Sequence, residues 1–157
     1  MNSDIEIIEY TPELKQDFYT INHQWISTMF KMEAADERAL LEPEKEILEP
    51  GGFIWFARHH KLGVVGTCAL IKKGENNFEL TKMGVLESAR GLKIGEQLLK
   101  FVIDFVRKNG FECFLLTNSD CEAAIHLYEK NGFSHDREIM EIYGASYNRC
   151  NVAMRLY

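Results

Sequence analysis

The spacing of apolar residues along the chain divides it into strands and helices. Continuous or alternating apolar runs predict strands at residues 5–8, 53–57, 64–71, 78–85, 111–117, 133–139 and 152–156. Apolar residues spaced three and four apart predict helices at residues 13–30, 33–41, 91–108 and 120–130. The early strands follow one another as hairpins, whereas the later strands alternate with helices. This order predicts an α/β or α+β fold with helices on the faces of a mixed sheet.

Length and composition are those of one ordinary globular domain. The chain has 157 residues, of which 46% are hydrophobic and 27% are charged, so we expect a single domain over residues 1–157. No apolar run approaches the roughly 20 residues that span a bilayer. The acidic start, with Asp4 and Glu6, lacks the basic and apolar regions of a secretory signal. We therefore expect a cytoplasmic protein that does not enter a membrane.

The net charge restricts the kind of partner. With 18 basic and 24 acidic side chains the formal charge is −6. Such a field repels polyanions, so we do not expect nucleic-acid binding. A small anionic ligand is still compatible with it, because backbone amides and a few cations can form a local anion site.

Cysteine and histidine spacing gives no metal motif. No two of the four cysteines have the C-x-x-C spacing of a zinc or redox site, and we expect all four to be reduced. The less favoured alternative is a reactive thiol at Cys121, which lies near a predicted helix start. His59 and His60 fall in a predicted hairpin turn, where a solvated surface pair is the expected state. We therefore predict that the protein has no metal site.

The chemically informative segment joins the strand at residues 78–85 to the long helix that follows. The turn between them reads Arg-Gly-Leu-Lys-Ile-Gly at residues 90–95. A glycine-containing turn at a helix N-terminus presents unpaired amides and the positive end of the helix dipole, which suits phosphate. Arg90 and Lys93 add local positive charge. The turn is neither a Walker loop nor a dinucleotide fingerprint.

This segment resembles the pyrophosphate loop of the GCN5-related N-acetyltransferases (GNAT). That loop reads Arg/Gln-x-x-Gly-x-Gly/Ala after a strand that ends in a Met-x-Val sequence, here Met83 to Val85. The chain departs from the pattern at Lys93, which stands where the first motif glycine is usual. Farther on, Ala124, Tyr128 and the Gly-Phe pair at 132–133 resemble the family's A-x-x-x-Tyr-x-x-x-Gly-Phe segment.

The resemblance implies a fold and a cofactor site. The expected fold is a mixed, mostly antiparallel sheet of six to seven strands with about four helices, splayed where acetyl-CoA binds. The backbone of residues 83–85 would pair with the pantetheine arm, and the amides near residues 91–96 would hold the diphosphate. The residues so assigned to acetyl-CoA are Met83, Gly84, Val85, Arg90, Gly91, Leu92, Lys93, Ile94, Gly95, Glu96, Asn118 and Tyr128.

The resemblance also implies catalytic roles. Tyr128 would be the general acid that protonates the CoA sulfur, and Glu79 the general base, acting through water. From pattern alone, a core position is the favoured interpretation of Tyr128. Glu79 is also compatible with a solvated strand position or a partner of Lys82, and Asn118 with a turn. Residues expected to border the acceptor are Trp25, Phe30, Glu79, Tyr143 and Tyr147, although the two aromatic residues of the first helix also fit a core role.

The predicted function is transfer of an acetyl group from acetyl-CoA to a primary amine by direct attack in a ternary complex. The acidic composition weakly favours a cationic acceptor. Two alternatives stay open, namely a non-catalytic acyl-CoA sensor or interaction module and a transferase for a longer acyl group. A homodimer is left open as well.

Overall fold

A single seven-stranded sheet organises the computed structural model, which describes residues 4–157. The strand order is β1-β2-β3-β4-β5-β7-β6, and every neighbouring pair is antiparallel except β4 and β5. This confirms the mixed, mostly antiparallel sheet. The strands are β1 (Ile5–Glu9), β2 (Phe53–His59), β3 (Gly63–Lys72), β4 (Asn77–Val85), β5 (Glu112–Thr117), β6 (Phe133–His135) and β7 (Val152–Leu156).

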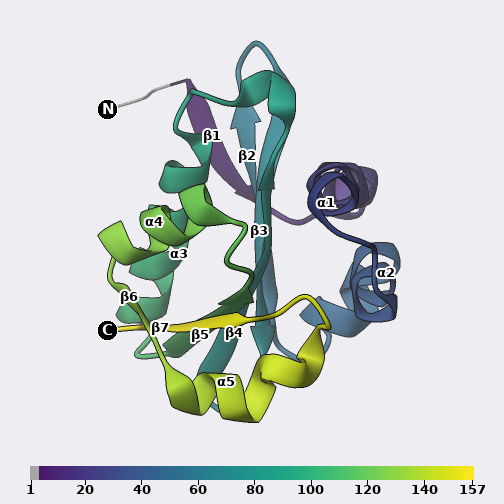
Figure 1. Ribbon diagram of the computed structural model, residues 1–157. Coiled ribbons are helices and arrows are strands. Elements are labelled where there is room, and N and C mark those ends of the chain that lie inside the picture. The colour runs from purple at the N-terminus through teal and green to yellow at the C-terminus, as the bar shows by residue number, and fades with distance from the viewer. Residues whose placement is uncertain (1–3) are drawn as a thin grey trace.

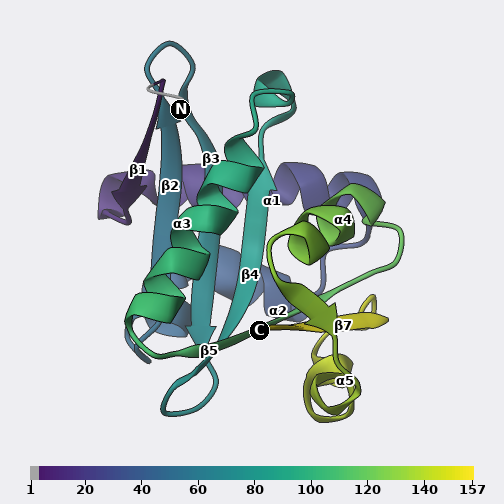
Figure 2. The ribbon, with the colours of Figure 1, turned by 90° about the vertical axis from the view of Figure 1, so that its left-hand side faces the viewer.

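Helices cover both faces of the sheet. In Figure 1, α1 and α2 lie on one side of the sheet, with α3 and α4 on the other. Figure 2 looks onto the face covered by α3. The helices are α1 (Lys15–Met29), α2 (Ala34–Leu41), α3 (Ile94–Lys108), α4 (Glu122–Lys130) and α5 (Arg137–Tyr143), with short helical turns at Pro12–Leu14, Glu44–Leu48, Glu87–Ala89 and Gly144–Ser146.

The region after α4 corrects one sequence prediction. We expected a strand over residues 133–139, but β6 ends at His135 and α5 begins two residues later. The Asp136 side chain accepts a hydrogen bond of 2.9 Å from the Ile139 backbone N–H, which is the N-cap interaction that starts a helix. Ile139 is then buried against Phe114 and Ala153. The capping residue, and not the short apolar run, therefore decides the local structure.

Two apolar layers hold the helices on the sheet. The inner face of α3, including Leu98, Leu99 and Val102, is fully buried against the sheet. On the opposite face, Phe18 of α1 packs edge-on against Phe56, with ring centroids 6.3 Å apart. Each such side chain contributes about 1.5–3 kcal/mol when fully buried. The two apolar layers hold helices against both faces of the sheet and so fix the positions of the strand ends between them.

The sheet opens between its two parallel strands. β4 and β5 pair only from Asn77–Glu112 to Leu80–Leu115. Beyond Leu80, β4 is irregular: the β3–β4 register shifts between Thr67 and Ala69, and Lys82 in this bulge has φ +51°. β5 turns away with its antiparallel partner β7. The expected splay is therefore present, and it leaves the β5-facing edge of residues 81–85 without a strand partner.

Within residues 4–157, no helix combines the length and the apolar character that crossing a membrane requires.

Gly84 controls how closely α1 approaches the open strand. A Cβ atom at this position would lie 2.5 Å from Trp25 Cδ1 and 3.3 Å from Ile21 Cγ2. Gly84→Ala is therefore expected to displace Trp25 and to reduce the free energy of unfolding by roughly 1–3 kcal/mol, measured by urea unfolding.

Gly74→Ala is the matched control, because the nearest atom to its added Cβ is Asn77 Cβ at an ordinary 3.5 Å. It should change the free energy of unfolding by less than about 0.5 kcal/mol. Equal losses in the two variants would show that the Trp25–Gly84 approach is not tight.

Candidate active site

A narrow cavity of about 50 Å³ lies where β4 and β5 separate. Its floor is formed by residues 80–83 of β4 and residues 115–118 at the end of β5. Cys121 and Tyr128 line it from the α4 side, while Trp25, Phe30, Tyr147 and Arg149 line it from the other. The cavity therefore connects the two faces of the sheet through the splay.

The turn into α3 carries a run of free backbone donors. None of the N–H groups of residues 91–96 donates a hydrogen bond to another residue within 4–157; the first helical bond runs from Gln97 N to Lys93 O at 3.1 Å. Gly91 (φ +87°) and Lys93 (φ +60°) both take left-handed conformations. Free amides at the positive end of a helix dipole are suited to bind an anion.

The backbone at Lys93 explains why a glycine is usual there. A left-handed conformation costs a residue with a Cβ about 1–2 kcal/mol, whereas glycine adopts it freely. Lys93 keeps the conformation despite this strain. Lys93 therefore takes a conformation that glycine adopts freely, and it adds an exposed cation to the turn.

The charged residues of this turn differ in their partners. Arg90 is exposed and makes no ion pair with another residue in the described range 4–157. Glu96 lies in the first turn of α3, and its carboxylate is 3.0 Å from Lys130 Nζ and 3.8 Å from Lys100 Nζ. The neighbouring Lys130 ammonium is the main cause of the lowered pKa of Glu96. Glu96 thus ties α3 to α4 with its side chain while its amide stays free.

The next two assigned positions lie on the open edge of β4. Met83 lines the cavity, and Val85 ends the strand at the point where the turn begins. Gly95 follows Val85 closely in space, since a Cβ at Gly95 would lie 3.8 Å from Val85 Cγ2. The free strand edge and the free amides of residues 91–96 are therefore adjacent.

Tyr128 reaches the cavity from α4. The residue is 7% exposed, and its ring packs edge-on against Phe133 at 5.8 Å. Its hydroxyl has no hydrogen-bond partner among residues 4–157. Burial, reinforced by Cys68 and Cys121, raises the pKa of Tyr128. The phenol therefore holds its proton at neutral pH, as a proton donor must.

Asn118 is a structural residue of the loops beside the cavity. Its Nδ2 donates to the Arg149 carbonyl at 2.7 Å, and its Oδ1 accepts from Asp120 N at 2.8 Å. Asn118 also lines the cavity. Both ends of its side chain are thus engaged by protein, and the residue fixes the position of the segment that carries Arg149.

Glu79 lies beside the cavity but not in its lining. It is 1% exposed, and its carboxylate is 3.8 Å from Lys73 Nζ. Burial raises the pKa of Glu79, although Lys73 and Lys82 act in the opposite direction. A carboxyl group with a raised pKa is a better proton acceptor, and its position requires water to connect it to the cavity.

The expected acceptor residues divide into two groups. Trp25, Phe30 and Tyr147 line the cavity. Tyr143 does not: its ring stacks on Phe114 at 4.4 Å, and its hydroxyl accepts a hydrogen bond of 3.3 Å from Asn77 Nδ2. The structure therefore brings three of the four predicted aromatic residues to one site.

The structure has a buried ionic cluster at the cavity that the sequence analysis did not predict. Asp36 is fully buried and accepts 2.7 Å hydrogen bonds from both terminal nitrogens of Arg149 and a 2.9 Å bond from Lys82 Nζ. Burial alone would raise the pKa of Asp36, but the hydrogen bonds from Arg149 and Lys82 outweigh it and hold the pKa well below its usual range. The only sequence signal was a lysine interrupting an otherwise apolar strand end.

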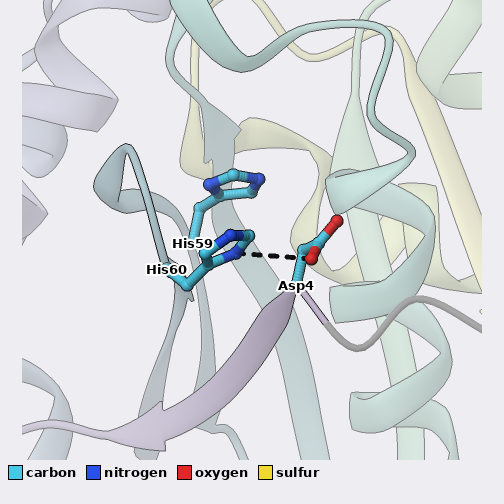
Figure 3. A group of neighbouring side chains, drawn as sticks. All are labelled: Asp4, His59 and His60. Carbon is cyan, nitrogen blue, oxygen red and sulfur yellow. Dashed lines mark ion pairs between the residues drawn. The ribbon is translucent and has the colours of Figure 1, made fainter.

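The histidine pair forms a second polar group, far from the splay along β2. Figure 3 shows His59 and His60 beside Asp4, whose carboxylate is 3.3 Å from His60 Nδ1. His59 Nδ1 accepts hydrogen bonds from the N–H groups of Lys61 and Leu62 at 3.1 and 3.2 Å. In the neutral ring the proton is then on Nε2, which leaves His59 no lone pair for a metal. These contacts favour a structural role for His59 in the hairpin turn between β2 and β3.

All four cysteines are free thiols, as expected. Cys68 and Cys113 are buried, and burial raises the pKa of Cys113 to about 12. Cys121 and Cys150 are half-buried and line the cavity.

Comparison with known proteins identifies the family. The Acetyltransferase (GNAT) family matches residues 13–133. The Xenopus tropicalis protein "Probable N-acetyltransferase camello" is 35% identical over 98 residues, which cover 60% of this chain and 45% of that protein. The chain spans about half the length of the curated relatives it matches.

Solved structures agree in fold. An acetyltransferase of the GNAT family from Staphylococcus aureus Mu50 superposes with a TM-score of 0.83 at 27% identity, covering 97% of this chain and 98% of that one. A spermidine N-acetyltransferase from Vibrio cholerae, solved with CoA and spermine, gives a TM-score of 0.73 at 17% identity, covering 99% and 96%. The chain belongs to the GNAT family of acetyltransferases.

Asp36 is the anionic centre of the ionic cluster, so its removal tests the stability of the cluster. Asp36→Asn leaves the buried Lys82 and the partly buried Arg149 without their shared carboxylate and should lower the free energy of unfolding at pH 7 by about 3–5 kcal/mol. The pKa of Asp36 is lowered in the folded state. Its contribution is therefore complete above about pH 4 and is lost as the pH falls from there towards the folded-state pKa.

Urea unfolding of wild type and variant between pH 7 and pH 3 checks both statements. Asp104→Asn is the control, because Asp104 pairs with Lys108 at 3.0 Å on the exposed face of α3. That exposed pair should contribute less than about 1 kcal/mol. A loss for Asp36→Asn no larger than for this control would contradict the argument.

Proposed function

We propose that the protein transfers the acetyl group of acetyl-CoA to a primary amine by direct attack in a ternary complex. The observation that carries the proposal is the run of six free amides at residues 91–96 beside an unpaired strand edge. Free donors at a helix N-terminus suit a diphosphate, and an open strand edge suits the amide groups of a pantetheine arm.

The residues of the splay fit acetyl-CoA as a substrate. The amides of residues 91–96 would bind the diphosphate, with Arg90 and Lys93 adding positive charge. Backbone groups of Met83 and Val85 would pair with the pantetheine arm. Acetyl-CoA would supply the activated acyl group, and the protein would orient it towards the cavity. Family membership supports this assignment.

Three chemical tasks remain for the side chains and backbone. The attacking amine must be neutral, and Glu79 would accept its proton through water, helped by a raised pKa. A backbone N–H near Val85 would stabilise negative charge that develops on the thioester oxygen. Tyr128 would donate the proton that the departing thiolate needs, since burial raises the pKa of Tyr128.

A non-catalytic acyl-CoA sensor would need the same free amides but no proton donor in the cavity. Tyr128 lines the cavity, and its hydroxyl has no hydrogen-bond partner among residues 4–157. A hydroxyl that no protein group engages is free to donate its proton to a molecule in the cavity, which favours an enzyme. A cytoplasmic location stays a prediction.

Acetyl-CoA should raise the melting temperature of the protein, because a ligand selective for the folded state stabilises it by mass action. At a concentration 100 times the Kd the gain is about 2.7 kcal/mol, or several degrees for a chain of this size. Differential scanning fluorimetry with acetyl-CoA measures it. S-acetylpantetheine, which lacks the diphosphate, should shift the melting temperature much less at the same concentration. No shift at millimolar acetyl-CoA would overturn the assignment of the turn.

Tyr128→Phe should lower kcat by about 10²–10⁴-fold while the Kd of acetyl-CoA changes little, because the hydroxyl acts only as the bond to sulfur breaks. Steady-state release of the CoA thiol gives kcat, and calorimetry gives the Kd. Tyr19→Phe, on α1 where Tyr19 stacks on His23, is the control and should leave both unchanged. Equal losses in kcat and in affinity would assign the Tyr128 hydroxyl to binding.

A further inference from the structure

The cavity wall is cationic, in contrast to the whole chain. Of the described residues that line the cavity, the only charged ones are Lys82 and Arg149. Their carboxylate partner Asp36 lies behind them and is fully buried. A molecule in the cavity therefore meets the two cations first and their counter-charge second.

The nearby carboxylates lie outside the lining of the cavity. Glu33 accepts hydrogen bonds from Asn148 N at 2.8 Å and from the backbone and side chain of Arg149 at 3.3 Å, so it is a second carboxylate partner of Arg149. Glu79 is paired with Lys73. Lys82 and Arg149 thus share Asp36, and Arg149 also pairs with Glu33. Neither carboxylate lines the cavity, so the two cations are the charged groups that a molecule there contacts first.

Both cations are held rigidly. Lys82 Nζ lies 4.8 Å and the Arg149 guanidinium 4.9 Å from the centre of the Tyr147 ring, and Lys82 Nζ also donates to the Tyr147 hydroxyl at 3.3 Å. Arg149 lies 5.7 Å from the Phe30 ring. Lys82 has a left-handed backbone, and its ammonium lies 2.9 Å from Asp36 of α2 on this face of the sheet. Such fixed donors are suited to bind a carboxylate with little loss of entropy.

We propose that the acceptor is an amine that also bears a carboxylate, as α-amino acids do, and that Lys82 and Arg149 bind this carboxylate. The inference rests on the proposed acetyl transfer and names its substrate class. A polyamine would instead place its own ammonium groups beside Lys82 and Arg149, and like charges at close range repel each other. The two cations that line the cavity thus outweigh the weak preference for a cationic acceptor that the net charge suggested.

Pairs of acceptors that differ only in the carboxylate test the proposal on the wild-type protein. L-phenylalanine is compared with phenethylamine, L-leucine with 3-methylbutylamine, and spermidine represents the cationic class. Release of the CoA thiol and mass of the acetylated product are measured with each. The carboxylate-bearing member should have a kcat/KM at least about 10-fold higher in each pair, since a binding site for an ionised group discriminates against the analogue that lacks it.

The outcomes separate the two proposals. Product from all acceptors with equal kcat/KM, or with spermidine preferred, would overturn the carboxylate site and leave acetyl transfer standing. Binding of acetyl-CoA without product from any amine would overturn acetyl transfer, and the acceptor class with it.

Variants of Arg149 and Lys82 test whether these residues cause the preference for acceptors that bear a carboxylate. Arg149→Gln should raise the KM for the amino acid by about 10-fold or more and bring the ratio within each pair towards one, while the melting shift with acetyl-CoA is kept. Arg155→Gln is the matched control, because Arg155 pairs with Asp136 and Glu138 and does not line the cavity. Should Arg149→Gln not fold, Lys82→Met, which keeps the Arg149–Asp36 pair, is measured in its place. An unchanged ratio in a folded variant would contradict the assignment.

Discussion

The end of pairing between β4 and β5 is the constraint on which the rest of the site depends. The two strands share a register for four residue pairs and then separate, because β4 bulges at Lys82 while β5 follows β7. A parallel pair that continued to the end of β4 would fill its own edge with hydrogen bonds and leave no cavity. The bulge is stabilised from one face of the sheet, by α1 packed on Gly84 and by the buried ion pair between Lys82 and Asp36 of α2. The opening between β4 and β5 is therefore maintained by specific contacts within the fold.

The two faces of the splay have different chemistry. The α3 and α4 side offers free amides, an exposed Arg90 and a protonated Tyr128, which suit a phosphorylated acyl donor. The α1 and α2 side offers aromatic rings and two rigid cations. The splay is the passage between the sides, so a donor and an acceptor entering from opposite faces would meet in it. This division fits a ternary complex better than a site that opens on one face alone.

The ionic cluster shows how local and overall electrostatics differ. The chain carries a formal charge of −6, yet the charged side chains on its cavity wall are Lys82 and Arg149. Long-range fields of exposed charges are screened by salt within about 10 Å, whereas buried pairs are screened much less. In the proposed acceptor site these two cations would therefore govern recognition, whereas the net charge would govern only the approach of an acceptor to the surface.

The sequence by itself determined what short stretches of chain specify. Periodicity located nearly all strands and helices, and the turn at residues 90–95 with the segment 124–133 indicated the family, because both depend on neighbouring residues. The strand predicted at residues 133–139 failed because one capping bond from Asp136 outweighs a short apolar run. Only the tertiary structure decided that Tyr143 packs away from the cavity and that Asp36, Lys82 and Arg149 share one ion cluster, since these three residues come from α2, β4 and the segment before β7. Contacts between residues so far apart depend on the register and bulges of the sheet, which no local pattern encodes.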